Sequence, residues 1–171
     1  MDASIRRATA EDAQALAELG AVTFAATFAD GYPPDELERF VANNHNPQKL
    51  GEALADPEVA IWIAELNGRP IGFAQASSPP DIPHAEVRPG HGELKRLYLL
   101  AEAQGSGLGA ALLERAVDWL QSRGRSPVWL SVWGHGHAAQ RFYARHGFEP
   151  VGEYDWPEVD FEDPAIIMRK G

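Results

Sequence analysis

One short segment restricts the fold of this chain more than any other, the glycine-rich sequence QGSGLG at residues 104–109. It follows ELKRLYLL, an apolar run typical of a strand, and it precedes AALLERAVDWL, whose apolar residues recur at helical spacing. A glycine loop at this position exposes backbone N–H groups at the start of a helix, where the helix dipole favours an anion. The segment therefore predicts a phosphate-binding loop in a fold that contains both strands and helices.

Three interpretations of the loop compete at this point. Gly105 to Ala110 matches G-x-G-x-x-A, the start of a dinucleotide-binding fingerprint, but the next strand, PVWLSV, is not followed by the Asp or Glu that would bind a ribose. A P-loop is disfavoured because the segment has no Lys followed by Ser or Thr. A plain helix start would not need three alternate glycines, each of which costs conformational entropy. The glycines instead indicate a backbone that closely approaches a ligand.

The remaining patterns divide the chain into alternating elements. Apolar periodicity, caps and turn residues predict strands at 4–8, 59–66, 70–76, 93–100, 127–133, 148–154 and 165–170, and helices at 9–28, 34–44, 47–56, 108–124 and 138–146. The Asn67-Gly68 pair predicts a hairpin between two of the strands. We expect one domain over residues 1–171. The segment 77–92 has four prolines and is expected to be a loop, either a surface excursion or a substrate lid.

A second motif follows the strand after the loop, Ala139-x-x-Phe142-Tyr143-x-x-x-Gly147-Phe148. Together with Gln104-x-x-Gly107-x-Gly109 it resembles the GNAT superfamily of acetyl-CoA-dependent N-acetyltransferases. The segments TFAATFADGYPPDELERF and LSVWGHGHAAQRFYARHGF are similar to the bacterial polyamine (spermidine/spermine) acetyltransferase-like branch. The resemblance implies an α/β (α+β) fold with a mixed, mostly antiparallel, twisted sheet of six to seven strands flanked by helices, and a splayed pair of central strands.

The resemblance also implies which residues bind acetyl-CoA. Its pyrophosphate would accept hydrogen bonds from the backbone of Gln104, Gly105, Ser106, Gly107, Leu108, Gly109 and Ala110, so an acidic protein could bind an anion without Lys or Arg. The main chain of Leu97, Tyr98 and Leu99 would pair with the pantetheine arm like an added strand. Gly136 occupies the position where the family usually has a cofactor-contacting Asn, and Gly134 replaces a Glu common in the polyamine branch.

Acetyl transfer needs a neutral amine, a polarised carbonyl and an acid for the departing thiolate. Tyr143 is the expected acid, because its ordinary pKa of about 10 keeps it protonated near neutrality. Glu93 is the first candidate for the base, directly or through water, and His135 is the second. His135 and His137 have no carboxylate partner that would make a metal site, so we expect none. Arg141, Arg145 and His146 are assigned to a solvated helix face.

Charge and composition restrict the partners. A net charge of −10 disfavours nucleic acid and would attract a cationic acceptor, although an excess of acidic residues is common in soluble proteins and solubility is the commoner reason for it. The sequence has no cysteine, no signal-peptide pattern and no apolar run that could span a membrane, which predicts a cytoplasmic protein without membrane partners. It does not distinguish a monomer from a homodimer.

The expected activity is transfer of the acetyl group of acetyl-CoA, in a ternary complex, to a primary amine of a small molecule, with a polyamine as the specific form. Two alternatives stay open: acetylation of protein N-termini or lysines, and a non-catalytic acetyl-CoA-binding module. The identity of the acceptor and of the general base, and the effect of Gly136, do not follow from the sequence.

Overall fold

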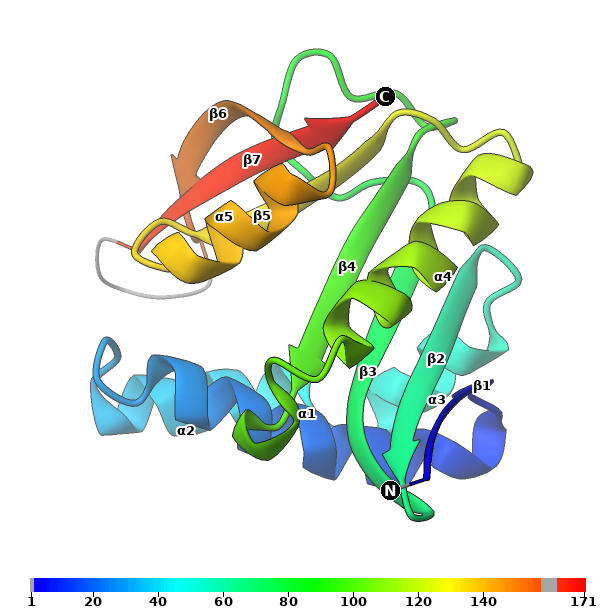
Figure 1. Ribbon diagram of the computed structural model, residues 1–171. Coiled ribbons are helices and arrows are strands. Elements are labelled where there is room, and N and C mark those ends of the chain that lie inside the picture. The colour runs from blue at the N-terminus through cyan, green and yellow to red at the C-terminus, as the bar shows by residue number, and fades with distance from the viewer. Residues whose placement is uncertain (1, 158–162) are drawn as a thin grey trace. The chain divides into compact units, whose positions relative to one another are not determined.

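The computed structural model describes residues 2–157 and 163–171. In chain order the elements are β1 (Ala3–Arg7), η1 (Ala10–Asp12), α1 (Ala13–Phe28), α2 (Pro34–Asn44), α3 (Pro47–Ala55), β2 (Val59–Leu66), β3 (Arg69–Ser77), β4 (Gly92–Leu99), η2 (Ala101–Ala103), α4 (Leu108–Ser122), β5 (Val128–Trp133), α5 (His137–Arg145), β6 (Glu149–Asp155) and β7 (Pro164–Lys170) (Figure 1). The described strands form one hydrogen-bonded order, β1-β2-β3-β4-β5-β7-β6. This is the mixed α/β, seven-stranded sheet that the sequence predicts.

The chain divides into two compact units. The first comprises residues 1–75 and 96–116, and the second comprises residues 76–95 and 117–171. The single-domain expectation stays a prediction.

In the first unit, β1 pairs antiparallel with β2, and Asn67 and Gly68 both have positive φ, as a tight hairpin turn between β2 and β3 requires. The apolar face of the unit is a buried cluster that joins α1 and α3 to β2 and β3: Leu16, Ala17, Leu19, Leu50, Ile61, Ile63 and Phe73, with Ala8. Asn46 caps α3 by accepting a hydrogen bond from Lys49 N at 2.9 Å, as predicted.

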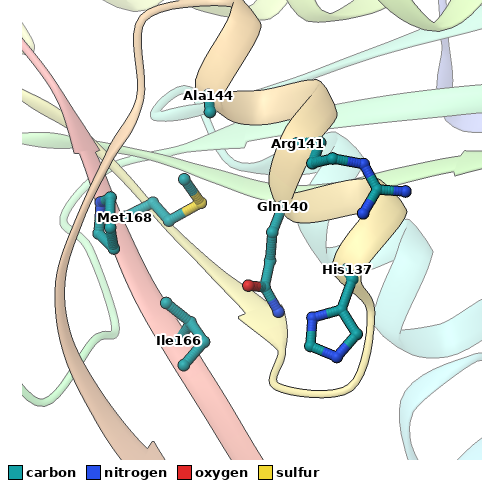
Figure 2. A pocket seen from close by; sticks show the side chains of 7 residues that line it. His137, Gln140, Arg141, Ala144, Ile166 and Met168 are labelled. Carbon is teal, nitrogen blue, oxygen red and sulfur yellow. The ribbon is translucent and has the colours of Figure 1, made fainter.

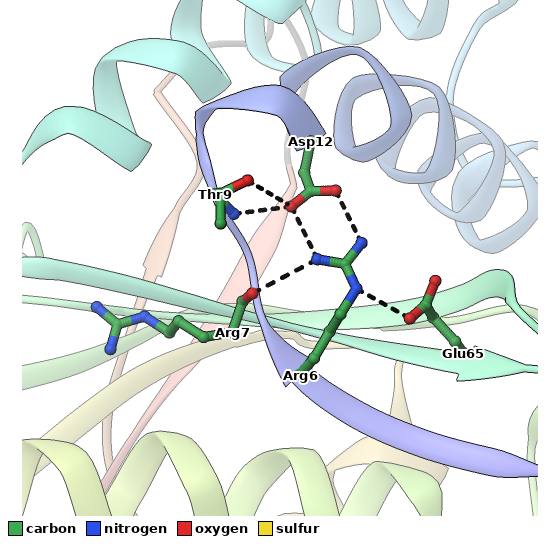
Figure 3. A network of polar contacts seen from close by, with 5 residues as sticks. All are labelled: Arg6, Arg7, Thr9, Asp12 and Glu65. Carbon is green, nitrogen blue, oxygen red and sulfur yellow. Dashed lines mark hydrogen bonds and ion pairs between the residues drawn. The ribbon is translucent and has the colours of Figure 1, made fainter.

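The start of the first helix differs from the sequence prediction. The segment after Thr9 begins as a short 3-10 turn, η1, before α1. Asp12 explains the turn, because its Oδ2 accepts a hydrogen bond from Thr9 N at 2.7 Å and the same carboxylate forms a two-bond ion pair with Arg6, at 2.8 and 3.0 Å (Figure 3). Arg6 also donates to Glu65 on β2 at 2.9 Å. The hydrogen bonds from Arg6 lower the pKa of Asp12 to about 2.

An aromatic cluster packs α1 against α2. Phe24 stacks on Phe40 with ring centroids 4.7 Å apart and lies 5.3 Å from the ring of His45. Burial, and secondarily the charge of Arg96, lowers the pKa of His45 to about 3, so this histidine is a neutral core residue. Its Nδ1 lies 3.1 Å from Nη1 of Arg96, whose Nη2 donates to the carbonyl of Asn44 at the end of α2 at 3.0 Å.

In the second unit, β4 and β5 are parallel, and the ladder joins Gly92 to Val128 and Glu93 to Trp129. β7 pairs antiparallel with both β5 and β6, and the β6–β7 ladder shifts register between Pro150 and Gly152. Helix α5 lies along this part of the sheet (Figure 1). None of the helices formed by residues 2–157 and 163–171 is long and apolar enough to cross a membrane.

Candidate active site

The glycine loop lies in the first unit, between the short turn η2 and the start of α4. Gly105 and Gly107 have φ of 80° and 87°, in the left-handed region that side-chain-bearing residues rarely adopt. A Cβ atom built on either glycine would meet nothing within 4 Å. The two glycines are therefore needed for the backbone path rather than for packing, and the space above them is open to a ligand.

The first turn of α4 supplies the donors. Its first intrahelical bond runs from Ala111 N to Gly107 O at 3.1 Å, and Leu108 N has only a long contact, 3.4 Å, to Ser106 Oγ. The N–H groups of Gly109 and Ala110 belong to the first turn of the helix, where no intrahelical carbonyl is available. This set of exposed donors at the positive end of a helix fits a pyrophosphate group.

Two side chains of the loop turn back to its own backbone. Gln104 Nε2 donates to Leu99 O at 3.4 Å, and Ser106 Oγ donates to Ala103 O. Both contacts shape the loop between β4 and α4. Gln104 N and Ser106 N also donate within the loop, to Ala101 O at 3.2 Å and Ala103 O at 3.3 Å. The anion-binding role of the remaining backbone N–H groups stays a prediction.

The strand that leads to the loop approaches its neighbour closely. A Cβ on Gly72 of β3 would lie 2.6 Å from Tyr98 O and 2.4 Å from a methyl of Leu99, so only glycine fits there. The Tyr98 side chain is partly buried against the core cluster of the first unit, burial raises its pKa, and its ring lies 5.4 Å from Phe73. The binding role of the main chain of Leu97, Tyr98 and Leu99 stays a prediction. The sequence analysis missed Gly72, although a glycine inside an apolar strand is a signal of close approach.

Glu93 lies in the second unit and is 5% exposed. Its Oε1 accepts a hydrogen bond from Asp81 N at 2.8 Å, and its Oε2 lies 4.0 Å from Lys95 Nζ. Burial raises the pKa of Glu93, against the opposing effect of the Lys95 charge. Glu93 is therefore not a solvated strand end. It is a buried carboxyl whose ionised form is a stronger base than an exposed glutamate.

Tyr143 lies on α5, also in the second unit. Its ring meets Phe142 at 5.3 Å and Phe148 at 5.9 Å, both nearly edge-on. Its carbonyl accepts hydrogen bonds from His146 N at 3.0 Å and Phe148 N at 3.1 Å, which end the helix at the left-handed Gly147. The second motif thus fixes the backbone and ring of Tyr143. Its role as an acid stays a prediction.

Gly136 and Gly134 lie where β5 leads into α5. A Cβ on Gly136 would lie 3.3 Å from Trp133 O, so a larger residue there needs a small shift. A Cβ on Gly134 would lie 3.0 Å from Pro164 O, and Gly134 N donates to that carbonyl at 2.8 Å. The two glycines let β5 turn tightly against the start of β7. Gly136 begins α5 without a side-chain cap.

Gln140 connects helix α5 to the end of β5. Its Nε2 donates to Trp133 O and to Gly134 O, both at 3.0 Å, and so holds α5 to the end of β5. The sequence analysis missed Gln140, because nothing in the local pattern shows that a helix residue reaches back to two strand-end carbonyls.

The second candidate base, His135, is exposed and packs its ring against Trp133 at a centroid distance of 5.3 Å. The described residues contain no group of three or more His, Asp or Glu side chains placed to hold a metal ion. Of the two candidate bases, Glu93 is buried and His135 is exposed.

A separate cavity of about 280 Å³ lies between α5 and the strands β6 and β7 (Figure 2). It is lined by His137, Gln140, Arg141, Ala144, Pro150, Ile166 and Met168. The sequence assigns none of these residues to the candidate site, and Arg141 was expected on a solvated helix face. Tyr143 and Glu93 do not line the cavity.

A parallel strand pair within a mostly antiparallel sheet, together with a left-handed glycine loop at a helix start, is the arrangement expected of an N-acetyltransferase. The chain belongs to the acetyltransferase (GNAT) family, whose sequence profile matches residues 15–148. The match includes both motifs, the glycine loop and the segment around Tyr143.

Relatives agree with this assignment, and a solved structure has the same fold. The chain is 30% identical over 148 residues to an N-acetyltransferase encoded in the pepI 3' region of Lactobacillus delbrueckii subsp. lactis, covering 86% of this chain and 85% of the relative. It is 35% identical over 141 residues to an N-acetyltransferase of Mycobacterium bovis, covering 82% and 85%. The fold matches that of the PaiA N-acetyltransferase from Thermoplasma acidophilum in complex with coenzyme A, with a TM-score of 0.80, 23% identity and 99% of both chains covered.

Proposed function

We propose that the acyl donor is acetyl-CoA and that the loop 104–110 binds its pyrophosphate. The observation that carries the proposal is the left-handed path of Gly105 and Gly107, which opens the backbone donors at the start of α4 inside the segment that matches the family. The similar fold of the PaiA N-acetyltransferase, solved with coenzyme A, supports the same donor. Acetyl-CoA supplies a thioester, and the chain supplies anion binding and proton transfer.

The acceptor in this proposal is a primary amine of a small molecule, acetylated directly in a ternary complex. The amine nitrogen forms a bond to the carbonyl carbon as the bond from that carbon to sulfur breaks. Glu93 takes the proton that the amine gives up, directly or through water, and Tyr143 gives a proton to the departing thiolate. The raised pKa of Glu93 supports the first role, because a stronger base accepts the proton more readily.

Polyamines are the first acceptors to test. The net charge of −10 supports them, because an acidic surface raises the encounter rate of a polycation. If this attraction operates, kcat/KM for spermidine falls more steeply with added salt than kcat/KM for a monoamine. Equal salt slopes for the two acceptors would reject electrostatic attraction of the polyamine.

The same charge disfavours nucleic acid as a partner, and the absence of cysteine supports a cytoplasmic location.

The experiment that tests the function is an acceptor screen with acetyl-CoA, in which release of free thiol is measured across polyamines, amino acids, aminoglycosides and peptides. Thiol release with a small amine, absent without it, is the expected result. Release with peptides alone would replace the proposal by protein acetylation. Binding of acetyl-CoA without release for any acceptor would leave a non-catalytic binding module.

A further inference from the structure

The loop between β3 and β4, residues 78–91, is packed against the sheet of the second unit. We call these residues the strap. Ile82 is 7% exposed and joins Trp129 and Ile167 in a buried cluster, with Val87 packed at its side. The strap is therefore not a loose surface excursion. It covers the sheet face that carries Trp129, the residue paired with Glu93 in the parallel ladder.

The beginning of the strap reaches the candidate base. Asp81 N donates to Glu93 Oε1 at 2.8 Å, and Lys95 Nζ lies 3.7 Å from Asp81 Oδ2. Ser78 Oγ donates to the carbonyl of His91 at 2.7 Å, which ties the two ends of the strap together. The orientation of the Glu93 carboxyl thus depends on whether the strap is in place.

His91 closes the far end of the strap in its neutral form. Its Nδ1 accepts two hydrogen bonds, from Trp129 Nε1 at 3.0 Å and from Arg88 N at 3.2 Å. Only an Nδ1 without a proton can accept them, so the ring proton is on Nε2. Protonation of His91 would place an N–H at Nδ1 against two N–H donors and break both bonds.

His84 shows the same arrangement in the middle of the strap. Its Nδ1 accepts from Glu86 N at 3.1 Å, so its Nε2 carries the proton and donates to Val151 O on β6 at 3.2 Å. Its ring lies 5.0 Å from the ring of Trp129. Two histidines therefore flank one buried tryptophan, and each uses a deprotonated Nδ1 to hold the strap backbone.

The charged groups around this cluster oppose a further positive charge. From β7, Arg169 lies over Trp129 at 5.3 Å and pairs with Glu86 at 3.0 Å. Burial, followed by the charges of Arg88 and Arg169, lowers the pKa of His91.

The other charged and polar groups on this face of the sheet do not offset the lowering of the pKa of His91. On β4 the carboxylate of Glu93 lies beside Lys95, which also lies near Asp81 of the strap. From β6, Tyr154 faces the cluster and donates its hydroxyl to Ser131 Oγ on β5 at 2.9 Å. Glu86 thus pairs with Arg169, Glu93 and Asp81 share Lys95, and none of these carboxylates is bonded to the ring of His91.

We propose that His91 is a positioning residue, whose neutral imidazole keeps the strap closed on Glu93 and whose protonation releases the strap and misaligns the carboxyl. The catalytic part of this inference rests on the proposed function, because it takes Glu93 as the base. The opening of the strap does not depend on it. The strap is thus a pH-sensitive contact next to Glu93, the proposed base.

The expected pH dependence follows from the direction of the pKa shift. A histidine whose pKa is lowered in the closed state stabilises that state above its ordinary value of about 6.5 and loses this stabilisation as the pH falls. Between that value and the lowered pKa of His91, each unit of falling pH raises the opening constant by up to about tenfold. Hydrogen exchange of the Asp81 amide measures this constant without any catalysis.

The experiment compares three variants of the whole chain with the wild type from about pH 8 to about pH 5. His91→Asn keeps an acceptor near the Nδ1 position but cannot be protonated, and His91→Leu removes the acceptor. His137→Asn, on the exposed start of α5, is the matched histidine control. Exchange of the Asp81 amide is followed by NMR, corrected for its intrinsic pH dependence, and kcat and KM for acetyl-CoA are measured on the same samples.

In the wild type and in His137→Asn we expect protection of the Asp81 amide to fall as the pH drops, together with kcat but with little change in KM. In His91→Asn the protection persists to lower pH. In His91→Leu it is lost at all pH values and kcat falls by about tenfold or more, a small share of what a positioned base contributes. Protection that does not vary with pH, or that titrates identically in His91→Asn and wild type, would overturn the proposal.

A failure of the inference about His91 can be distinguished from a failure of the proposed function. If Glu93→Gln keeps full activity while the strap still opens with pH, the role of Glu93 in the proposed function is wrong and the pH-sensitive strap remains. If Glu93→Gln is inactive and the strap does not respond to His91, the inference is wrong and the proposed function remains.

Discussion

The backbone N–H of Asp81 donates to Oε1 of Glu93 at 2.8 Å, so a loop residue orients a carboxyl that is almost completely buried. This contact selects the ionised form, whereas burial selects the protonated form, and burial is the larger effect on the pKa. Burial makes the ionised Glu93 carboxylate a stronger base, and the hydrogen bond from Asp81 N fixes its orientation.

Glu93→Gln keeps the shape and the acceptor for Asp81 N but removes the base, so kcat is expected to fall by about 10²–10⁴-fold. The folded protein should not be less stable. A raised carboxyl pKa means that stability is lost as the pH rises above the ordinary value of 4.5, and the neutral amide avoids this loss. Steady-state rates and thermal melts at neutral pH measure both effects. A kcat close to that of the wild type would remove Glu93 as the base.

Tyr143→Phe keeps the ring that packs against Phe142 and Phe148 but removes the proton assigned to the thiolate. We expect kcat to fall by about 10²–10⁴-fold, while Kd for acetyl-CoA stays within a few-fold. Tyr154→Phe is the matched control in the same unit, because it loses one hydrogen bond to Ser131 and is expected to cost about 1 kcal/mol of stability. The opposite pattern, a stability loss with unchanged kcat in Tyr143→Phe, would make Tyr143 a core residue.

Asp12→Asn tests the ion pair that joins β1 to the first helical turn. The lowered pKa of Asp12, about 2 against an ordinary 3.8, stabilises the fold above the ordinary value, and this stabilisation is lost as the pH falls from about 4 to about 2. Because Arg6 is 42% exposed, solvent screening limits the loss in Asp12→Asn at neutral pH to about 1 kcal/mol. Denaturant unfolding measures the free energy of unfolding of variant and wild type at neutral pH and at the acid end of this range. The two values are expected to differ at neutral pH and to converge in acid. A difference independent of pH would contradict the ion-pair explanation.

The sequence predicts the glycine loop and most elements because their signals are local. The hairpin turn at Asn67 and the cap at Asn46 follow from residue types at fixed offsets, whereas the positive φ of Gly105 and Gly107 comes from the structure. Prolines predict a loop at 77–92, but they do not show where that loop packs.

The rest of the site depends on contacts between residues distant in sequence. Glu93 contacts the strap through Asp81 N, and the role of the two strap histidines is recognisable only once their hydrogen-bond partners on β5 and β6 are known. Gln140 was missed for the same reason, since a helix residue acquires this role from its neighbours, whereas Gly72 carries a local signal, a glycine inside an apolar strand.

The most direct test of the acetyl-CoA assignment is a calorimetric titration of acetyl-CoA into the wild type, Gly107→Glu and Gly68→Ala. Gly107→Glu places bulk and negative charge at the proposed phosphate site, whereas Gly68 has a similar positive φ and open surroundings in the β2–β3 hairpin, so it controls for backbone strain of about 1–2 kcal/mol. The wild type and Gly68→Ala are expected to bind, and folded Gly107→Glu is expected not to bind. Unchanged affinity in folded Gly107→Glu, or a dinucleotide that raises the Tm of the wild type more than acetyl-CoA does, would contradict the assignment.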